Sequence, residues 1–289
     1  MAAAVSEQTV SIADLFVHPV KSCARIALDQ ALLTETGLEW DRQWMVVDEQ
    51  SDFISQRTHP RLALVKPTLR LNDLVLRAPG MLALHLALDA IDRETTVQVW
   101  NDRLRAGDMG DLAAQWFTDF LGQPVRLARF DPEVQRASDA RWTGEARALT
   151  AFADAFALLV TSTASIAELN RRLLVRGAAA VGSERFRPNL VLDGLDAHGE
   201  DWLDRIEFDT PQGPVVLRLV KPCTRCSIPD VDPERGEPDQ AVGAELASYR
   251  ADARMDGRIT FGMNAIIERG LECVLTAGLQ GRASIRFDT

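Results

Sequence analysis

Two of the four cysteines in this 289-residue chain lie close together and beside two cations. They belong to the segment Lys221-Pro222-Cys223-Thr224-Arg225-Cys226, which follows an apolar run ending at Val220. Nearby positive charge favours the ionised sulfur, which is both the nucleophile and the soft metal ligand. The sequence therefore predicts that cysteine chemistry occurs at Cys223 and Cys226.

A Cys-x-x-Cys pair is compatible with four kinds of site: a structural thiol pair, a redox dithiol, half of a zinc site, or a site for another metal. A zinc site needs about four ligands, usually as two close pairs, and the chain has no second Cys-x-x-Cys and no His-x-His group. Its histidines are scattered at His18, His59, His85 and His198. The residues alone leave the four interpretations open.

The composition is that of a soluble globular protein, with 46% hydrophobic and 26% charged residues. No apolar run approaches the roughly 20 residues that span a bilayer, and the N-terminal segment Met1 to Glu7 lacks the basic start and apolar core of a secretory signal. We therefore expect a cytoplasmic protein without disulfides. The net charge of -10 argues against a broad nucleic-acid or membrane surface but allows a local basic pocket for one anionic ligand.

Short β-branched, aromatic and apolar runs bounded by Pro, Gly or Asp predict a chain rich in strands. The predicted strands are 10–17, 43–48, 62–65, 69–71, 82–86, 95–100, 189–192, 205–208 and 215–220, and 157–160 is a further apolar run. Helical spacing predicts a helix within 108–121, capped by Asp108 or Asp111 and stopped by Gly122. A second helix is predicted over 162–173, where Ser or Thr caps the start.

The segment between Phe130 and Leu149 is rich in Asp, Arg, Glu and Ala, which indicates a connection between two domains. We predict domains at 1–130 and 150–289, with 131–149 as the connecting segment. The predicted fold class is β-rich α+β, with two β-barrel-like modules, peripheral helices and no parallel βαβ order. The alternative is a single open α+β sheet.

Two further sites place cations at strand edges. Lys21 and Ser22 follow the first predicted strand and offer an ammonium and a hydroxyl, whereas Arg187 and Asn189 precede a later strand and offer a guanidinium and an amide. Such groups suit a phosphate or a heterocycle. Taken singly, each is equally compatible with a solvated surface cation.

Together, and in this order, these motifs resemble the MOSC family, named after the C-terminal domain of molybdenum cofactor sulfurase. The segments 19–23 and 37–46 resemble the family's N-terminal β-barrel domain, and 152–156, 186–189 and 221–226 with Asp232-Pro233 resemble the MOSC domain. Within the family, the chain is most similar to members that reduce amidoximes or detoxify N-hydroxylated bases.

The resemblance implies a molybdenum-molybdopterin cofactor held between the modules, with Cys226 as the catalytic residue and protein ligand to the metal and Cys223 as a neighbour only. A thiolate is a soft donor suited to such a metal. By positional match, the cofactor-binding residues would be Lys21, Ser22, Arg42, Asp154, Ala155, Phe156, Arg187, Asn189, Thr224 and Asn264.

The implied activity is reduction of N-hydroxylated compounds, such as hydroxylamines, amidoximes and N-hydroxylated bases, to amines. The alternatives are a sulfur-transfer or cofactor-handling protein in which Cys226 carries a persulfide, and a noncatalytic binding module. Animal members of the family tend to carry two threonines after the metal-ligand cysteine, where this chain has Pro229-Asp230. Asp230 is a candidate proton relay, although Asp more often stabilises turns.

Electrons are expected to come from a separate donor protein of the ferredoxin, flavin or haem type. Only Cys273 follows Cys226, so no four-cysteine iron-sulfur cluster is expected downstream, and no Gly-rich dinucleotide fingerprint is evident. An acidic donor would dock on a basic rim. The candidates for this rim are Arg171, Arg172, Arg176 and Arg185, which are also compatible with solvated helix-face arginines.

Overall fold

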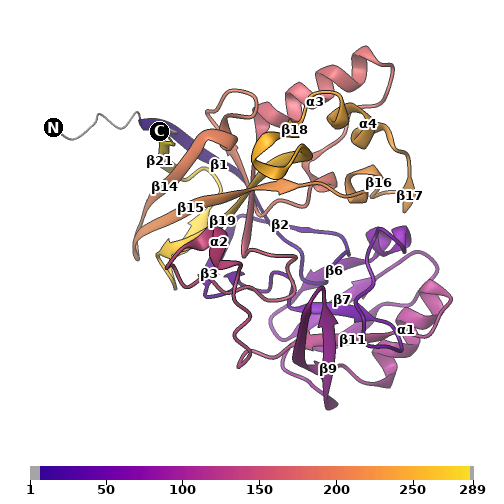
Figure 1. Ribbon diagram of the computed structural model, residues 1–289. Coiled ribbons are helices and arrows are strands. Elements are labelled where there is room, and N and C mark those ends of the chain that lie inside the picture. Colours follow the sequence, from indigo (N-terminus) through magenta and orange to yellow (C-terminus); the bar gives the residue numbers. More distant parts are fainter. Residues whose placement is uncertain (1–6, 287–289) are drawn as a thin grey trace.

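The computed structural model of the chain describes residues 7–286 and shows two bodies (Figure 1). The upper body in the figure contains a closed strand barrel, and the lower one contains two smaller sheets and a helix. Among the described residues, no helix is both long and apolar enough to cross a bilayer. Most of the N-terminal segment on which the predicted compartment depends, residues 1–6, lies outside the described residues.

Seven described strands form the barrel in the order β12, β13, β1, β21, β14, β15 and β19, and β19 pairs back to β12 to close it. Their bounds are β1 (Glu7–Val17), β12 (Leu158–Ser162), β13 (Leu190–Asp193), β14 (Leu203–Thr210), β15 (Gly213–Thr224), β19 (Arg258–Arg269) and β21 (Gln280–Ile285). Ile12, Ile206 and Leu217 are fully buried in its core. Closure leaves these strands with partners on both sides.

The first strand of the chain lies inside this barrel. β1 pairs antiparallel with β13 and β21, which sets Leu15 opposite Leu190 and Glu7 opposite Ser284. In Figure 1 the indigo β1 runs among the orange and yellow strands of the C-terminal half. The first strand of the sequence therefore belongs to the barrel of the C-terminal half. The sequence did not predict this, because an apolar pattern indicates a strand but not the strand with which it pairs. The domain boundaries themselves stay a prediction.

Short strands extend the barrel body. β2 (Ile26–Leu28) pairs with β1, and β18 (Ala251–Asp252) pairs with β19. A three-stranded sheet orders β20 (Val274–Thr276), β3 (Gln30–Thr34) and β4 (Gly37–Leu38). β16 (Val231–Asp232) and β17 (Glu237–Pro238) form a separate pair. Residues 26–38 thus also contribute strands beside the barrel.

The two sheets and the helix of the second body are formed by residues 44–130, and Val20 and Cys23 also pack in its core. One sheet orders β5 (Trp44–Val47), β11 (Arg126–Phe130), β10 (Asp102–Asp108) and β9 (Arg93–Val99), and the other orders β6 (Lys66–Leu69), β7 (Asp73–Arg77) and β8 (Leu84–Ala87). Helix α1 (Asp111–Leu121) buries Phe117 against Trp44 and neighbouring apolar residues. The predicted strand-rich architecture with a few helices is confirmed.

The predicted helix after residue 162 is α3 (Thr163–Val175), where the Ser162 hydroxyl accepts a hydrogen bond from the backbone N–H of Ser165, as the capping rule requires. α3 connects β12 to β13, and these two strands are parallel. The expectation of no parallel βαβ order is therefore wrong at this one place. The other described helices are α2 (Ala140–Thr143), within the connecting segment, and α4 (Ala241–Ala247).

Local chemistry explains two further differences. The predicted strand at 62–65 is mostly a 3₁₀ turn, η1 (Pro60–Leu64), because Pro60 fixes a helical φ at its start. Helix α1 is capped by Gly110, not by Asp108 or Asp111; the Asp108 carboxylate instead accepts the Gly110 N–H. The remaining 3₁₀ turns are η2 (Ser183–Arg185), η3 (Gly199–Trp202), η4 (Ile228–Asp230) and η5 (Ala253–Met255).

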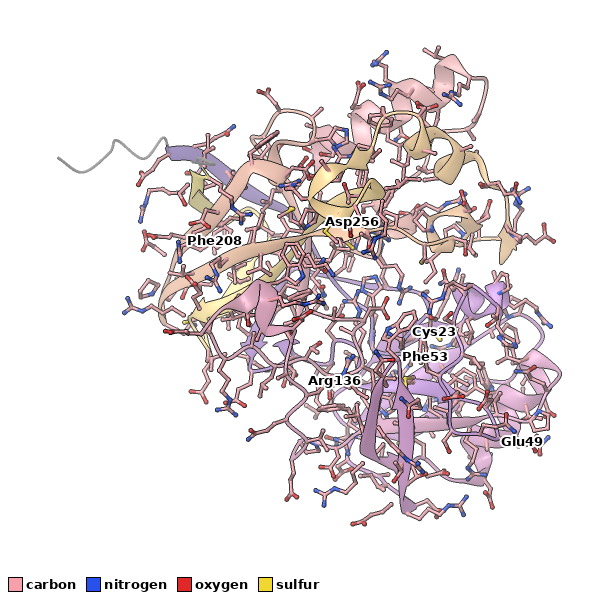
Figure 2. All side chains as sticks on the ribbon, in the orientation of Figure 1. Cys23, Glu49, Phe53, Arg136, Phe208 and Asp256 are labelled. Atoms are coloured by element: carbon pink, nitrogen blue, oxygen red, sulfur yellow. The ribbon has the colours of Figure 1, made fainter. Side chains whose placement is uncertain are left out.

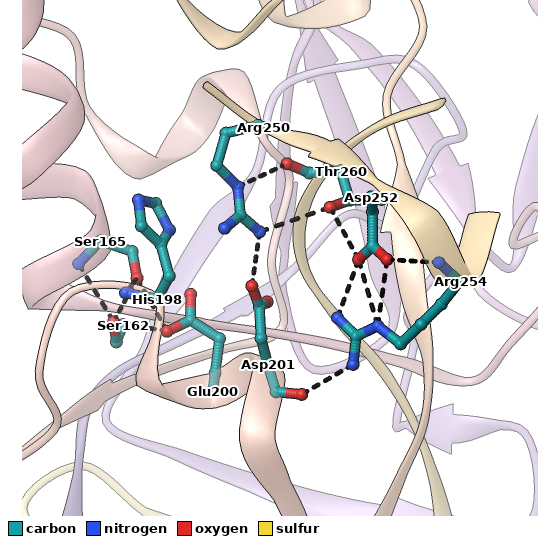
Figure 3. Close-up of polar contacts among 9 residues, drawn as sticks. All are labelled: Ser162, Ser165, His198, Glu200, Asp201, Arg250, Asp252, Arg254 and Thr260. Atoms are coloured by element: carbon teal, nitrogen blue, oxygen red, sulfur yellow. Dashed lines mark hydrogen bonds and ion pairs between the residues drawn. The ribbon is translucent and has the colours of Figure 1, made fainter. Parts of the chain in front are cut away.

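A buried polar network joins η3 to α3 and β19 (Figure 3). Glu200 is fully buried, and its Oε2 accepts hydrogen bonds from the hydroxyls of Ser162, at 2.8 Å, and Ser165, at 2.7 Å. Beside it, Arg250 donates to the Asp201 carboxylate at 2.6 Å. Burial raises the pKa of Glu200 more than the Ser165 hydroxyl lowers it. The fold therefore favours the protonated form of Glu200.

This preference predicts how Glu200→Gln changes stability. Because the folded pKa lies above the unfolded one, the free energy of unfolding falls as pH rises from the ordinary Glu range toward the folded pKa. The neutral amide has no such titration, so the melting temperature of the variant relative to the wild type should rise with pH. Thermal unfolding between pH 4.5 and 8 tests this, with exposed Glu145→Gln as control; a difference independent of pH would contradict it.

Candidate functional site

A cavity of about 750 Å³ lies between the two bodies and is lined by both. Cys226 and every residue predicted to bind the cofactor line it: Lys21, Ser22, Arg42, Asp154, Ala155, Phe156, Arg187, Asn189, Thr224 and Asn264. These residues come from six separated segments of the chain. The structure thus brings the predicted site residues together, while their individual roles stay predictions.

The two thiols of the Cys-x-x-Cys segment face different surroundings. β15 ends at Thr224, and Cys226 lies in the following turn with an exposed side chain. The Cys223 sulfur accepts a hydrogen bond from Arg225 Nη1 at 3.0 Å, and the Cys226 sulfur accepts a longer one from Arg57 Nη1 at 3.8 Å. Both thiols line the cavity, and Cys226 is the more exposed of the two.

The thiols are not part of a zinc site formed by the described residues. No group of three or more His, Cys, Asp or Glu side chains gathers there in a way that could hold a metal. All four cysteines are free thiols. A metal bound at Cys226 would need its remaining ligands from a cofactor or from solvent.

The electrostatic character of the cavity is strongly positive. Its described lining contains seven cationic side chains, Lys21, Arg42, Arg57, Arg187, Lys221, Arg225 and Arg258, against the single carboxylate of Asp154. This local excess contrasts with the net charge of -10 for the chain. The cavity suits an anionic ligand that reaches several of these cations at once.

Asn189 connects the cations of the two bodies. Its Oδ1 accepts hydrogen bonds from Arg42 Nη1 at 3.0 Å and from the Leu159 N–H at 3.1 Å, and its Nδ2 donates to the Phe16 carbonyl at 3.2 Å. Arg42 Nη2 also donates to the Arg187 carbonyl at 2.9 Å. Asn189 thus holds Arg42 against β1 and β12, so its side chain positions a cavity cation.

Three of the predicted binding residues have left-handed backbones. The φ angles are 67° at Ser22, 50° at Arg42 and 60° at Arg187, and none of these residues is glycine. A non-glycine residue in this region costs free energy, of order 1–3 kcal/mol, and persists only where its surroundings hold it. Such residues cluster at binding sites, and here all three line one cavity.

Two of the cavity cations, Arg42 and Arg187, repel each other. Burial and the neighbouring Arg42 charge lower the pKa of Arg187 to about 9. Asp41 compensates in part: although burial opposes its ionisation, the Arg42 charge holds the pKa of Asp41 at about 2. An anionic group bound between Arg42 and Arg187 would relieve this repulsion, so the cavity fits a cofactor with an anionic tail.

A stack of side chains forms the wall nearest Cys226. The Arg57 guanidinium lies over the rings of Trp100, at 4.6 Å, and Phe53, at 5.6 Å. Trp100 Nε1 donates to the Asp154 carboxylate at 3.3 Å, and Lys21 donates to the same carboxylate. Figure 2 labels Phe53 where the lower body faces the upper one. Aromatic faces thus fix the direction of the Arg57 cation.

The opposite wall holds Lys221 among aromatic rings. Its Nζ lies 5.5 Å from the ring centre of Trp142 and 5.8 Å from that of Phe156. Asn264 Nδ2 donates to the Lys221 carbonyl at 3.2 Å and so joins β19 to β15. The sequence had placed Trp142 only in a connecting segment, yet this segment supplies a ring beside the cavity lining.

Sequence reasoning missed Arg57, Trp100 and Arg258. Each lines the cavity, but none lies in a motif or at a spacing that distinguishes it from a surface residue. Only the folded chain places Arg57 beside Cys226, because the two are 169 positions apart. No local sequence signal marks these residues.

The candidate proton relay, Asp230, lies outside this cavity. Its Oδ1 accepts the Gly243 N–H at 2.6 Å, and the residue lies in the short turn η4.

The four arginines proposed for a docking rim, Arg171, Arg172, Arg176 and Arg185, all form ion pairs. Their partners are Glu168, Glu245 and Asp239. Arg185 is buried, so it is wrong as part of an exposed rim.

Comparison with known proteins identifies two domains in the chain. Residues 9–124 match the model of the MOSC N-terminal beta barrel domain, and residues 149–278 match that of the MOSC domain. The mitochondrial amidoxime reducing component 2 of Bos taurus is 34% identical over 254 residues, covering 84% of this chain and 73% of the relative. The mitochondrial amidoxime-reducing component 1 of Homo sapiens is 32% identical with the same coverage.

A third relative comes from another branch. The molybdenum cofactor sulfurase of Homo sapiens is 28% identical over 292 residues, which covers 93% of this chain but only 32% of the sulfurase. The sulfurase match extends over both matched domains of this chain, and the name of the sulfurase refers to the molybdenum cofactor. From the matched models and from relatives above 30% identity, we conclude that the chain belongs to the MOSC family.

Proposed function

We propose that this protein is a molybdenum cofactor-dependent reductase of N-hydroxylated compounds, supplied with electrons by a separate donor protein. The observation that carries the proposal is the exposed Cys226 thiol in a cavity lined by seven described cations. The names of the amidoxime-reducing relatives support the choice of substrate class. No dinucleotide fingerprint is evident in the sequence, which is why the donor is proposed to be separate.

Each cavity residue has a proposed part in holding the cofactor. Cys226 would ligate molybdenum as a thiolate, and Arg57 Nη1 donates a hydrogen bond to its sulfur at 3.8 Å. Arg42, Arg187 and Lys21 would bind the anionic tail, with Asn189 keeping Arg42 in place. Ser22, Thr224 and Asn264 offer hydroxyl and amide groups to the heterocycle, and the segment Asp154-Ala155-Phe156 forms the adjoining wall.

The proposed reaction consumes two electrons and two protons. An N–O bond breaks, the amine keeps the nitrogen, and the oxygen leaves as water: R–NHOH + 2 e⁻ + 2 H⁺ gives R–NH₂ + H₂O. When bound, the cofactor supplies the redox chemistry, and the donor protein supplies the electrons. The role of this chain is to hold the cofactor, orient the substrate and keep the site positive.

Turnover of benzamidoxime tests the proposal. Molybdenum-loaded protein with a small artificial reductant should convert benzamidoxime to benzamidine, with product measured by chromatography. Protein prepared without molybdenum serves as the control. Full metal loading with no detectable amidine would overturn the reductase assignment.

A sulfur-transfer function is the second candidate. It is supported by the match to molybdenum cofactor sulfurase along 93% of this chain and by the exposure of Cys226, since a persulfide carrier must reach its acceptor. Mass spectrometry after incubation with a sulfur donor separates the two functions. Under the reductase proposal, Cys226 should gain no stable extra sulfur atom in the molybdenum-loaded protein.

Docking of the donor predicts a dependence on salt. Arg258 is 64% exposed, lies 3.5 Å from the exposed Asp256 carboxylate and lines the cavity, whereas the arginines of α3 do not line it. An acidic donor should therefore approach at the cavity mouth, and its turnover should fall steeply as salt rises from 0.05 to about 0.5 M, while that of a small uncharged reductant changes little.

Matched variants locate the docking surface. Arg258→Gln should weaken the salt dependence seen with the donor protein, and Arg171→Gln should leave it unchanged, because Arg171 lies outside the cavity and is paired with Glu168. Equal salt sensitivity with both reductants would assign the effect to the active site and exclude docking at this rim.

A further inference from the structure

A second cavity, of about 410 Å³, adjoins the first one on the side of Cys226. Arg57 lines both cavities, and Ser227, the residue after Cys226, lines the second. Its wall mixes polar and apolar groups: Gln56, Gln240 and Asp230 beside Val231. Unlike the main cavity, it has one cation and one carboxylate in its described lining. It therefore lacks the strong positive charge that suits an anionic cofactor.

The carboxylate of this second cavity has no ion-pair partner. Asp230 is half-buried, its Oδ1 accepts the Gly243 N–H at 2.6 Å, and no described cation lies within ion-pair distance of it. Burial raises the pKa of Asp230, and the nearby charge of Asp239 adds to this effect. A partly desolvated carboxylate that opens onto a cavity is poised to accept N–H donors from a ligand.

The two sides of the cavity present complementary groups. Asp230 offers carboxylate oxygens, and Arg57, held by its stack on Trp100, offers N–H donors between the cavity and the Cys226 sulfur. An amidine-type group is planar and carries N–H donors that a carboxylate can accept in pairs, in the manner of a guanidinium. Its N-hydroxyl would then need to be directed toward Cys226.

We propose that this second cavity is the substrate pocket and that Asp230 determines specificity by binding the N–H edge of amidine-type substrates, namely amidoximes, N-hydroxyguanidines and N-hydroxylated bases with such an edge. This inference rests on the proposed reductase function. It separates the two cavities by charge: the cation-rich one holds the cofactor, and the one containing Asp230 holds the organic substrate. The amidine product is a cation, so Asp230 binds the product as well.

Binding of benzamidine to the molybdenum-loaded protein tests the pocket without any turnover. Isothermal titration calorimetry should show benzamidine binding to the wild type and a loss of affinity of about ten- to hundredfold in Asp230→Asn, because a charged hydrogen bond is lost. Glu237→Gln is the matched control, since Glu237 is exposed on β17 beside the cavity but does not line it.

A second variant moves the carboxylate without removing its charge. A Cβ at Gly243 would clash with Asp230 Oδ2, and Gly243 lies in α4 with an ordinary helical backbone. Gly243→Ala should therefore displace the carboxylate and weaken benzamidine binding at least about threefold, although alanine favours the helix. This variant distinguishes a binding role from the structural role of the Asp230 contact with the Gly243 N–H. Unchanged affinity in both variants would overturn the proposal.

Turnover then separates this proposal from the reductase proposal. In Asp230→Asn, KM for benzamidoxime should rise about ten- to hundredfold, whereas KM for an N-alkylhydroxylamine, which lacks an amidine edge, should stay within about twofold of the wild type. Equal KM values for benzamidoxime in wild type and variant would overturn the pocket and leave the reductase standing. If benzamidine binding depends on Asp230 but no substrate is turned over, the pocket stands and the reductase proposal is overturned.

Discussion

Replacing Cys226 with serine is expected to remove molybdenum from the purified protein and to lower benzamidoxime turnover by more than about a hundredfold. A serine hydroxyl is a poorer donor than a thiolate for a soft site, and loss of partners that merely orient a metal ligand already costs about 10–100-fold. Metal analysis by mass spectrometry, on protein from a host able to make the cofactor, gives the first measurement. Single-variant kinetics gives the second.

Cys223→Ser is the matched control for this prediction. The Cys223 sulfur accepts a hydrogen bond from Arg225, and a serine hydroxyl can replace it as an acceptor. We expect this variant to keep its molybdenum and at least about a third of its turnover. Equal metal loss in both variants would favour a dithiol site, and stoichiometric zinc in the wild type would refute the assignment.

Asn189→Ala is expected to lower the free energy of unfolding by about 3–5 kcal/mol. The substitution leaves Arg42 without one acceptor and leaves the buried Leu159 N–H and Phe16 carbonyl without their side-chain partner. Arg42 also loses the contact that directs it into the cavity, so the molybdenum content should fall as well. Urea denaturation measures the first effect and metal analysis the second.

Asn101→Ala provides the comparison, because Asn101 lines the same cavity with an exposed side chain. Surface substitutions of this kind change stability by about 0.5 kcal/mol or less. If the two variants unfold at the same urea concentration, the Asn189 contacts do not stabilise the fold as described. If Asn189→Ala is destabilised but binds molybdenum fully, its role is confined to packing.

Much of the architecture could be predicted from local patterns. The β-branched run at 215–220 predicted a strand, and the hydroxyl of Ser162 predicted the start of a helix; the structure has both. Such signals can be read from the sequence because they act over a few residues. Cys226, Lys21 and Arg187 stood out by residue type and position, whereas Arg42, Asn264 and the segment 154–156 could be proposed only through the resemblance of motifs. The structure then brought those residues to one cavity, which the patterns alone could not do.

The features that the sequence did not predict depend on contacts between segments that lie far apart in the chain. Arg57 and Trp100 belong to no motif, and their place beside Cys226 follows from how the two bodies pack. The left-handed backbone at Arg42 is imposed by its surroundings, since the residue type disfavours it. The partner of a strand is likewise set by the whole fold, as the parallel pair β12 and β13 shows.

The position of β1 has a consequence for how the chain folds as it is synthesised. β1 lies between β13 and β21, so the earliest strand to leave the ribosome is one of the last to find both partners. The body that contains residues 44–130 can fold first, and β2 can pair with Leu15 to Val17 of β1, whereas Glu7 to Ser11 of β1 lack their β21 partner until residue 285 has emerged. Such long-range closure slows folding and makes early C-terminal truncation a route to aggregation. Proteolytic cleavage within 131–149 should leave the N-terminal and C-terminal fragments bound to each other, because β1 of the N-terminal fragment stays hydrogen-bonded to β13 and β21 of the C-terminal fragment.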